Sequence, residues 1–453
     1  MVPTRNPREV LVRLLQELIR NSCVNNGNGG HESRSAESLR RFFQGYGLKA
    51  EIFEKVPGRG NLVLRIPGTD PAAPSLAFMG HTDVVPAEAA DWKRDPFGGE
   101  LLDGEVWGRG TVDMLNMTAA QAVGFAEAVT RNGPFPGDLL YLALADEEAS
   151  GTYGARWLTD EHWDAVACDY MVSEIGGFFI SGRRGESAAL GIGEKGVAWI
   201  RLTARGVSGH GSIPFGSSNA IDTLIQAGER LGHLRFPHRP GLLFRSMARG
   251  ASASLWEELL LTMAPLRGLG LKRIYRRSPG AARWLHAASS TTSSIGIIEG
   301  GSKINVIPGE AHLDLDIRII PGEDLDTVLK RLKSRLRGLK DRIEIEVLEY
   351  FPPTISPASG PLVEASRLLL KDLRSDADIL PILISGATDG RFWRRRGTRV
   401  YGFSLFGDEM TLDRFSGMLH GVDERISLSS LYRSLEYYTR LPGVFFSGSK
   451  GGR

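Results

Sequence analysis

Continuous apolar runs alternate with amphipathic stretches in the first part of the chain. The apolar runs at 75–80, 139–145 and 169–173 are bounded by turn or polar residues, as expected for strands buried on both faces of a sheet. Apolar residues recur at helical spacing between 10 and 19, and the alanine-rich stretch 114–130 predicts a long helix. Strands alternating with helices predict an α/β fold with a mostly parallel sheet covered by helices.

The pattern changes near Gly193. Apolar and polar residues alternate at 196–204, 311–319 and 343–348, which is typical of half-exposed antiparallel strands, and helical spacing is found at 219–231 and 325–339. Patterns of buried strands return at 379–384 and 398–403, followed by a closing helix at 428–441. We therefore predict a first domain formed by residues 1–194 and 351–453, with an α+β domain inserted at 195–350.

Two segments fit this scheme poorly. Residues 240–290 lack a clear periodicity, although their four clustered basic residues could touch an anionic partner or a membrane surface. A solvated face is the favoured interpretation, because apolar residues do not gather opposite the charges. The polar, glycine-rich tail at 447–453 predicts disorder.

Composition narrows the class of protein. The 453 residues, with 42% hydrophobic and 24% charged residues, suit a globular protein of two domains, and a net charge of +2 argues against a nucleic-acid binder. Two cysteines exclude a disulfide scaffold and suit a reducing compartment. No stretch approaches the roughly 20 apolar residues that cross a bilayer, and the N-terminus lacks the apolar core of a signal peptide. We expect a cytoplasmic enzyme with no membrane partner.

Acidic residues and a histidine follow the three buried strands. His81 and Asp83 follow the first strand, Glu147 and Glu148 follow the second, and Glu174 follows the third. The carboxyl ends of parallel strands meet at the sheet edge where ligands usually bind. Adjacent carboxylates repel one another unless a cation or a proton compensates them, although a solvated helix start is the alternative explanation for the acidic run.

Two further candidates come from other parts of the chain. Asp113 directly precedes the predicted helix, where an N-cap is the alternative role, and His420 lies in a loop before the closing helix. A carboxylate bonded to the second ring nitrogen orients a metal-bound histidine, so Asp83 can support His81. Two histidines with several carboxylates suit zinc or a similar divalent metal. The excess of carboxylates suggests two ions that share a bridging ligand, with about 3.5–4 Å between the two ions.

Four segments together resemble one known family. They are 81–86 (HTDVVP), 108–114 (GRGTVDM), 146–148 (DEE) and 420–424 (HGVDE). In this order they are similar to the co-catalytic zinc metallopeptidases that include aminoacylase, acetylornithine deacetylase, succinyl-diaminopimelate desuccinylase, glutamate carboxypeptidase and carnosinase. The resemblance covers nearly the whole chain and leaves 240–290 unassigned. The sequence departs from the family where Leu115-Asn116 replaces the usual Lys-Gly, and where Ile175-Gly176 follows Glu174 in place of a common proline.

The resemblance implies a role for each matching residue. One metal ion would be held by His81, Asp113 and Glu174, and the other by Asp113, Glu148 and His420, so that Asp113 bridges the two. Glu147 would be the general base and acid, and Asp83 would orient His81. The two ions would be zinc, with cobalt or manganese accepted by the same ligands.

The inserted domain resembles the family's lid and dimerisation domain. His210 would stabilise the tetrahedral oxyanion, usually across the interface of a homodimer. Asn305 and Arg318 match segments that bind the carboxylate end of the substrate, and Thr388 and Arg391 match a second substrate loop. An arginine can grip a carboxylate with two hydrogen bonds, although Arg318 without the resemblance would be an ordinary exposed strand arginine.

These expectations define a function. We expect a hydrolase that cleaves an amide bond of a dipeptide or N-acyl amino acid bearing a free carboxylate, through a metal-activated water. One alternative is a dedicated biosynthetic deacylase, such as a desuccinylase or deacetylase. A non-catalytic binding protein on the same fold is another alternative, but it should have lost a ligand or the base, and none is lost here.

Overall fold

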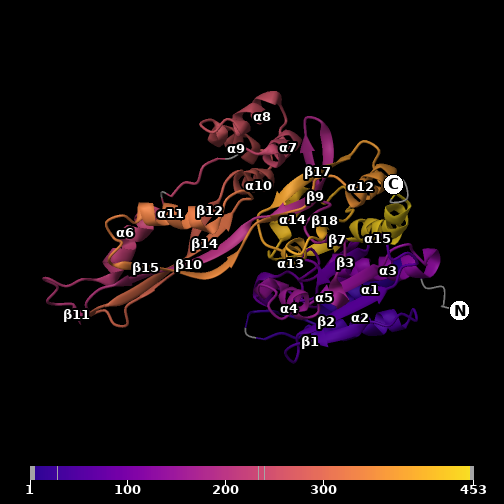
Figure 1. Ribbon diagram of the computed structural model, residues 1–453, viewed down its shortest axis with the longest axis horizontal. Helices are drawn as coiled ribbons and strands as arrows, with labels where there is room; N and C mark the ends of the chain where they lie inside the picture. The colour runs from indigo at the N-terminus through magenta and orange to yellow at the C-terminus, as the bar shows by residue number, and fades with distance from the viewer. Residues whose placement is uncertain (1–5, 28, 233, 239, 449–453) are drawn as a thin grey trace.

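The computed structural model describes residues 6–27, 29–232, 234–238 and 240–448. Its larger sheet has ten strands in the order β1-β2-β6-β3-β7-β18-β9-β16, with β17 and β8 also paired to β9 (Figure 1). The pairs β6·β3, β3·β7, β7·β18 and β17·β9 are parallel. The strands are β1 (Glu51–Glu54), β2 (Gly60–Ile66), β3 (Leu76–His81), β6 (Leu139–Leu144), β7 (Tyr170–Ser173), β8 (Phe179–Gly182), β9 (Gly185–Glu194), β16 (Thr354–Ile355), β17 (Asp378–Ile384) and β18 (Arg399–Gly402).

Helices cover both faces of this sheet. Alternate strand residues point to opposite sides, and because both sets are apolar, both faces must be buried. Phe78 and Tyr141 join the core beneath one layer of helices, while Met79 and Leu142 join a separate core beneath the other. The prediction of a mostly parallel, helix-covered sheet is confirmed. The first layer contains α1 (Pro7–Arg20), α2 (Ser33–Gln44), α3 (Leu115–Asn132), α12 (Pro361–Leu373) and α15 (Leu428–Gly448); the second contains α4 (Ala155–Glu161), α5 (Trp163–Val166) and α13 (Gly390–Arg394).

A second sheet extends away from the first (Figure 1). Its order is β12-β14-β10-β15, all antiparallel, and its buried face packs on two helices in a core of its own. The strands are β10 (Gly196–Arg205), β12 (Thr292–Gly300), β14 (Glu310–Ile319) and β15 (Ile343–Phe351), and the helices are α6 (Ala220–Gly232) and α11 (Leu325–Arg335). The alternating patterns identified three of these strands but not β12. The residue limits given for the two domains stay a prediction.

The unassigned segment 240–290 is helical. It forms α7 (Leu242–Ala251), α8 (Leu255–Thr262), α9 (Arg267–Tyr275) and α10 (Pro279–Ser289). Helix α7 packs on β17, α10 packs on α7 and α9, and the segment contributes buried residues, including Phe244 and Leu285, to the core of the ten-stranded sheet (Figure 1). The segment is therefore attached to the larger sheet, although it lies within the range predicted for the insertion.

The closing helix is longer than its predicted range. Because α15 continues to Gly448, the prediction of a disordered tail is wrong for residues 447 and 448, while residues 449–453 lie outside the described part of the chain. A small sheet joins early and late segments of the chain through β4 (Glu100–Leu102), β5 (Glu105–Trp107) and β19 (Arg425–Ser427). Within the described residues, no helix combines the length and apolarity that a membrane crossing requires.

Candidate active site

The acidic strand ends meet at one edge of the larger sheet. His81 is the last residue of β3 and lies opposite Leu144, the last residue of the parallel strand β6. Glu147 and Glu148 therefore follow immediately beside it, and Glu174 follows the next parallel strand, β7. The parallel register brings together side chains that are distant in the sequence.

Asp113 lies between two histidines. One carboxylate oxygen is 3.1 Å from Nε2 of His81, and the other is 3.1 Å from Nε2 of His420. Glu174 approaches the first imidazole at 3.8 Å, and Glu148 approaches the second at 3.3 Å. Two groups of three potential ligands result, and they share Asp113.

The electrostatics of these residues fit bound cations. Burial raises the pKa of Glu148, and it raises that of Glu174 to about 7, because carboxylates are crowded together with little water. One oxygen of Glu148 is buried without a hydrogen-bond partner among the described residues. Burial also opposes ionisation of Asp113, but hydrogen bonds from His420 and His81 outweigh it and hold its pKa below the usual range. The donor set therefore suits two divalent ions.

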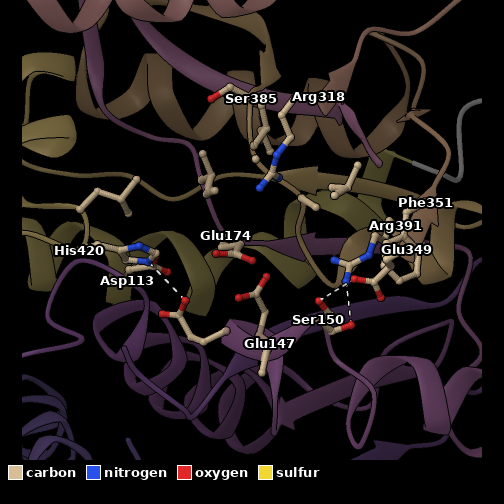
Figure 2. Close-up of a pocket in the computed structure, with 18 of the residues that line it drawn as sticks. Asp113, Glu147, Ser150, Glu174, Arg318, Glu349, Phe351, Ser385, Arg391 and His420 are labelled. Atoms are coloured by element: carbon tan, nitrogen blue, oxygen red, sulfur yellow. Dashed lines mark hydrogen bonds and ion pairs between the residues drawn. The ribbon is translucent and has the colours of Figure 1, made fainter. Parts of the chain in front are cut away.

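Glu147 belongs to neither group of ligands. Its carboxylate points into the cavity towards Glu174 (Figure 2). Burial, together with the charge of Glu174, raises its pKa well above the ordinary value. A carboxylate that adjoins the ligands without joining them is positioned to exchange a proton with a reacting group.

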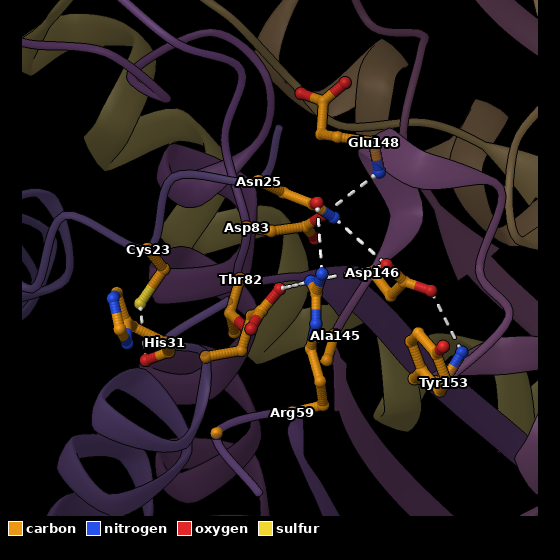
Figure 3. Close-up of polar contacts among 12 residues, drawn as sticks. Cys23, Asn25, His31, Arg59, Thr82, Asp83, Ala145, Asp146, Glu148 and Tyr153 are labelled. Carbon is orange, nitrogen blue, oxygen red and sulfur yellow. Dashed lines mark hydrogen bonds and ion pairs between the residues drawn. The ribbon is translucent and has the colours of Figure 1, made fainter. Parts of the chain in front are cut away.

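Asp83 contacts both the loop that carries Glu147 and Glu148 and the ring of His81. Its two oxygens accept the backbone N–H groups of Glu147 and Glu148 at 3.2 and 3.0 Å, and one also accepts the side chain of Asn25 at 2.9 Å (Figure 3). Nδ1 of His81 lies 2.9 Å from the backbone carbonyl of Asp83, compared with 3.5 Å from its carboxylate. The main chain therefore makes the closer contact with the histidine.

The side chain of Asp146 contacts the main chain and a buried arginine. One oxygen accepts the backbone N–H of Tyr153 at 2.9 Å, and the other lies 3.3 Å from the guanidinium of Arg59 (Figure 3). Arg59 in turn pairs with the buried Glu32 at 2.5 Å. Asp146 thus fixes the turn that follows Glu147 and Glu148.

Glu424 organises the loop that carries Asp113. Its carboxylate accepts the backbone N–H groups of Val112 at 2.6 Å and of Asp113 and Gly110 at 3.1 Å, and it pairs with Arg109 at 2.8 Å. The sequence motif contains Glu424, but sequence reasoning gave it no role. Its signal was its place four residues after His420.

A cavity of about 520 Å³ opens above these residues. Arg318 extends into it from β14, and its Nε also bonds Asp316 at 2.8 Å (Figure 2). The rest of the lining includes apolar side chains from several elements: Ile175, Val197, Trp199, Trp284, Phe351, Ile384 and Leu419. The site thus combines the guanidinium of Arg318, a cluster of acids and several apolar side chains.

The second predicted substrate loop contributes unequally. Arg391 lines the cavity, but its guanidinium already donates to the backbone carbonyls of Thr388 and Ser150 at 2.6 and 2.9 Å. Thr388 is buried, and its backbone N–H donates to Glu194. Arg391 therefore links two loops at the rim, while Thr388 is not among the residues that line the cavity.

His210 and Asn305 lie far from the cavity. His210 ends the short strand β11 (Gly209–His210), which pairs with β13 (Val306–Ile307) directly after Asn305. This separate two-stranded sheet lies at the outer end of the second sheet, and His210 and Asn305 are both exposed (Figure 1). A single chain does not bring them to the acidic cluster.

Comparison with known proteins agrees with this arrangement. The chain is 27% identical to the N-fatty-acyl-amino acid synthase/hydrolase PM20D1 of Xenopus tropicalis, over 96% of this chain and 85% of that protein. It is 28% identical to the succinyl-diaminopimelate desuccinylase of Methylobacterium radiotolerans, over 97% and 98% of the two chains. The fold matches the metallo-carboxypeptidase Sso-CP2 of Sulfolobus solfataricus with a TM-score of 0.73, at 18% identity and over 96% and 99% of the chains. Residues 77–442 match the model of peptidase family M20/M25/M40, and the chain therefore belongs to this family of metal-dependent hydrolases.

Proposed function

We propose that the protein hydrolyses the amide bond of a dipeptide or N-acyl amino acid that carries a free carboxylate. The observation that carries the proposal is the position of Asp113 between two histidines, with Glu147 beside the ligands and free of them. His81, Asp113 and Glu174 would hold one ion, and Asp113, Glu148 and His420 the other. When bound, the two ions would polarise the scissile carbonyl and acidify water.

The residues of the chain would manage the proton and the substrate. Glu147 takes a proton from the attacking water as the water oxygen adds to the carbonyl carbon, and returns it to the amine nitrogen as the carbon–nitrogen bond breaks. The products are a carboxylic acid and an amine. Asp83 keeps the backbone of Glu147 in place through its hydrogen bond. Arg318 exchanges its contact with Asp316 for the substrate carboxylate, which it can bind with two hydrogen bonds.

Zinc is the proposed metal, because two imidazoles and several carboxylates form a borderline donor set. Cobalt and manganese accept the same ligands. We expect two ions per wild-type chain in elemental analysis after zinc loading and desalting. A content near one ion would contradict the shared-ligand arrangement.

Replacement of the base tests the mechanism. Glu147→Ala should reduce kcat by at least about 10²–10⁴-fold, since it removes the proton carrier, while its zinc content stays at the wild-type value. Asp113→Ala should lose both activity and metal. Substantial turnover by zinc-loaded Glu147→Ala would reject Glu147 as the base.

We also propose a homodimer formed through the second sheet. Strand β12 is at the edge of this sheet and exposes Ile295, Ile297 and Ile298, whose exposed fractions are 45–58%. An exposed apolar edge strand favours pairing with another chain. A second copy would supply His210 to stabilise the oxyanion, and Asn305 to contact the substrate.

Mixed dimers test this arrangement. His210→Ala and Glu147→Ala should each be inactive alone. After unfolding and refolding together in equal amounts, they should regain about a quarter of wild-type activity, since half of the dimers would then contain one complete site. Absence of recovery despite a dimeric mass in light scattering would reject the shared site.

A panel of substrates distinguishes a hydrolase of broad specificity from a dedicated biosynthetic deacylase. Zinc-loaded enzyme should hydrolyse several dipeptides or N-acyl amino acids. Turnover restricted to one acylated diamino acid would favour the biosynthetic alternative.

We further propose that the enzyme works in a reducing compartment such as the cytoplasm. Cys23 and Cys168 are both buried free thiols, and burial raises their pKa to about 11 and about 12. Titration of freshly isolated, denatured protein should therefore find two thiols per chain. A blocked or oxidised pair would contradict this location.

A further inference from the structure

Helix α10 is fixed at both of its ends. At its start, Asp413 of α14 (Leu412–Met418) accepts the backbone N–H of Gly280 at 2.7 Å. At its end, the buried Lys195 donates to the backbone carbonyls of Ala287 and Ser290, both at 3.0 Å. One anchor is on the helix that leads to His420, and the other is at the junction of β9 and β10. The helix is therefore held in a defined position beside the site.

Trp284 occupies the middle of this helix. Its ring packs edge-on against Phe178 at a centroid distance of 5.2 Å, and Phe178 stacks on Phe415 at 4.7 Å. Trp284 is half-buried and also lines the cavity. Rigid aromatic packing behind the indole holds it against the cavity, so the helical segment 240–290 supplies part of the substrate site.

Three further apolar residues line the same cavity as Trp284. Ile175 directly follows the ligand Glu174, Leu419 directly precedes the ligand His420, and Ile384 ends β17. This apolar wall, defined as Ile175, Trp284, Ile384 and Leu419, begins next to the residues that surround the reacting bond. A charged group bound there would lose its hydration without gaining a partner.

We propose that the apolar wall binds the acyl group of the substrate, and that this group is a hydrocarbon chain or ring. Arg318 and Arg391 are the arginines that line the cavity, and Arg391 is already bonded to two carbonyls. The carboxylate of the amino acid therefore goes to Arg318 and the acyl group occupies the wall. This inference rests on the proposed amide hydrolysis and specifies the class of substrate.

A series of N-acylglycines tests the inference, because glycine has no side chain to compete for the wall. In zinc-loaded wild type, kcat/KM should rise from acetyl through butyryl to hexanoyl by up to about fourfold per methylene. N-succinylglycine should be at least about tenfold poorer than N-butyrylglycine, since its second carboxylate would be desolvated. Trp284→Ala should reduce the ratio of hexanoyl to acetyl turnover by about tenfold, and Trp284→Leu by less.

Trp256→Ala is the matched control. Trp256 lies in α8 of the same helical segment but is 72% exposed, so its replacement should leave the chain-length dependence unchanged. A flat series in wild type, or a preference for the succinyl substrate, would overturn the proposal. A loss of side-chain preference among N-acetyl amino acids in Trp284→Ala, with the acyl series intact, would also overturn it.

Binding separates this inference from the proposed reaction. Calorimetry with zinc-loaded Glu147→Ala should show tighter binding of N-hexanoylglycine than of N-acetylglycine, and Trp284→Ala in that background should remove most of the difference. This result would support the wall even if no amide were hydrolysed. Equal binding of the two ligands would reject the wall even if hydrolysis were observed.

Discussion

The carboxylate of Glu424 accepts a hydrogen bond from the backbone N–H of Asp113 at 3.1 Å. The loop bearing Asp113 is therefore held by a residue that lies 311 positions later in the chain. Glu424→Gln removes the charge that pairs with Arg109 and weakens the acceptors for this loop. We expect zinc affinity to fall about 10–100-fold, as is usual for residues that orient ligands. Competition with a chelator measures the change, and Glu257→Gln, a buried glutamate in α8, should have no effect on affinity.

Removal of the metal should destabilise the protein. Without cations, the clustered carboxylates repel one another, and an ion that binds only the folded chain stabilises it by about 4 kcal/mol at 1,000 times its dissociation constant. Chelation should therefore lower the midpoint of thermal unfolding, and added zinc should restore it. Asp113→Ala should show little response to either treatment. An equal response in this variant would place the stabilising ion elsewhere.

The buried pair formed by Arg59 and Glu32 should matter more than an exposed pair of similar length. Arg59→Met leaves Glu32 and Asp146 without their cation, and we expect a loss of about 3–5 kcal/mol in the free energy of unfolding. Lys55 bonds Glu161 at 2.7 Å on the surface, where Lys55→Met should cost about 0–1 kcal/mol. Urea denaturation with saturating zinc compares the two. Equal losses would show that burial does not determine the strength of these pairs.

Lys195 should make stability depend on pH. Burial lowers its pKa from 10.5 to about 7, so between these values the unfolded chain holds a proton that the folded chain lacks. Stability relative to Lys195→Met should consequently rise with pH across this window, by on the order of 1 kcal/mol per pH unit. Urea midpoints of both proteins at pH 7 and 9 measure the effect. A constant or falling difference would indicate that the three acceptors around Nζ, which are the carbonyls of Ala287 and Ser290 and the hydroxyl of Thr292, keep the amine charged.

The sequence was most informative about site residues that directly follow a buried strand. His81 and Glu174 directly end buried apolar runs, and a parallel sheet places such ends at one edge, so the cluster could be predicted without coordinates. The hydrogen bonds of Asp83 could not be predicted in full, because its carboxylate contacts a loop 64 residues later in the chain, where the register of two strands determines the distance.

The missed elements have a different physical cause. Strand β12 exposes most of its residues and shows no alternation, so its position depends on pairing with β14. Helices α7–α10 are short, and their tertiary packing, of α7 on β17 and of the four helices on one another, decides which of their faces are buried. The sequence therefore could not predict Trp284 as a site residue, since only the packing of α10 brings its ring to the cavity.

The position of His420 after the strands of the second sheet has a consequence for synthesis of the protein. A nascent chain that has emerged as far as β7 and Glu174 carries the three side chains of the first group of ligands. The second group remains incomplete until the ribosome has translated His420. Complete loading is thus coupled to the return of the chain to its first sheet. Ribosome-bound chains stalled before His420 should take up at most one ion, and chains released after α15 should take up two.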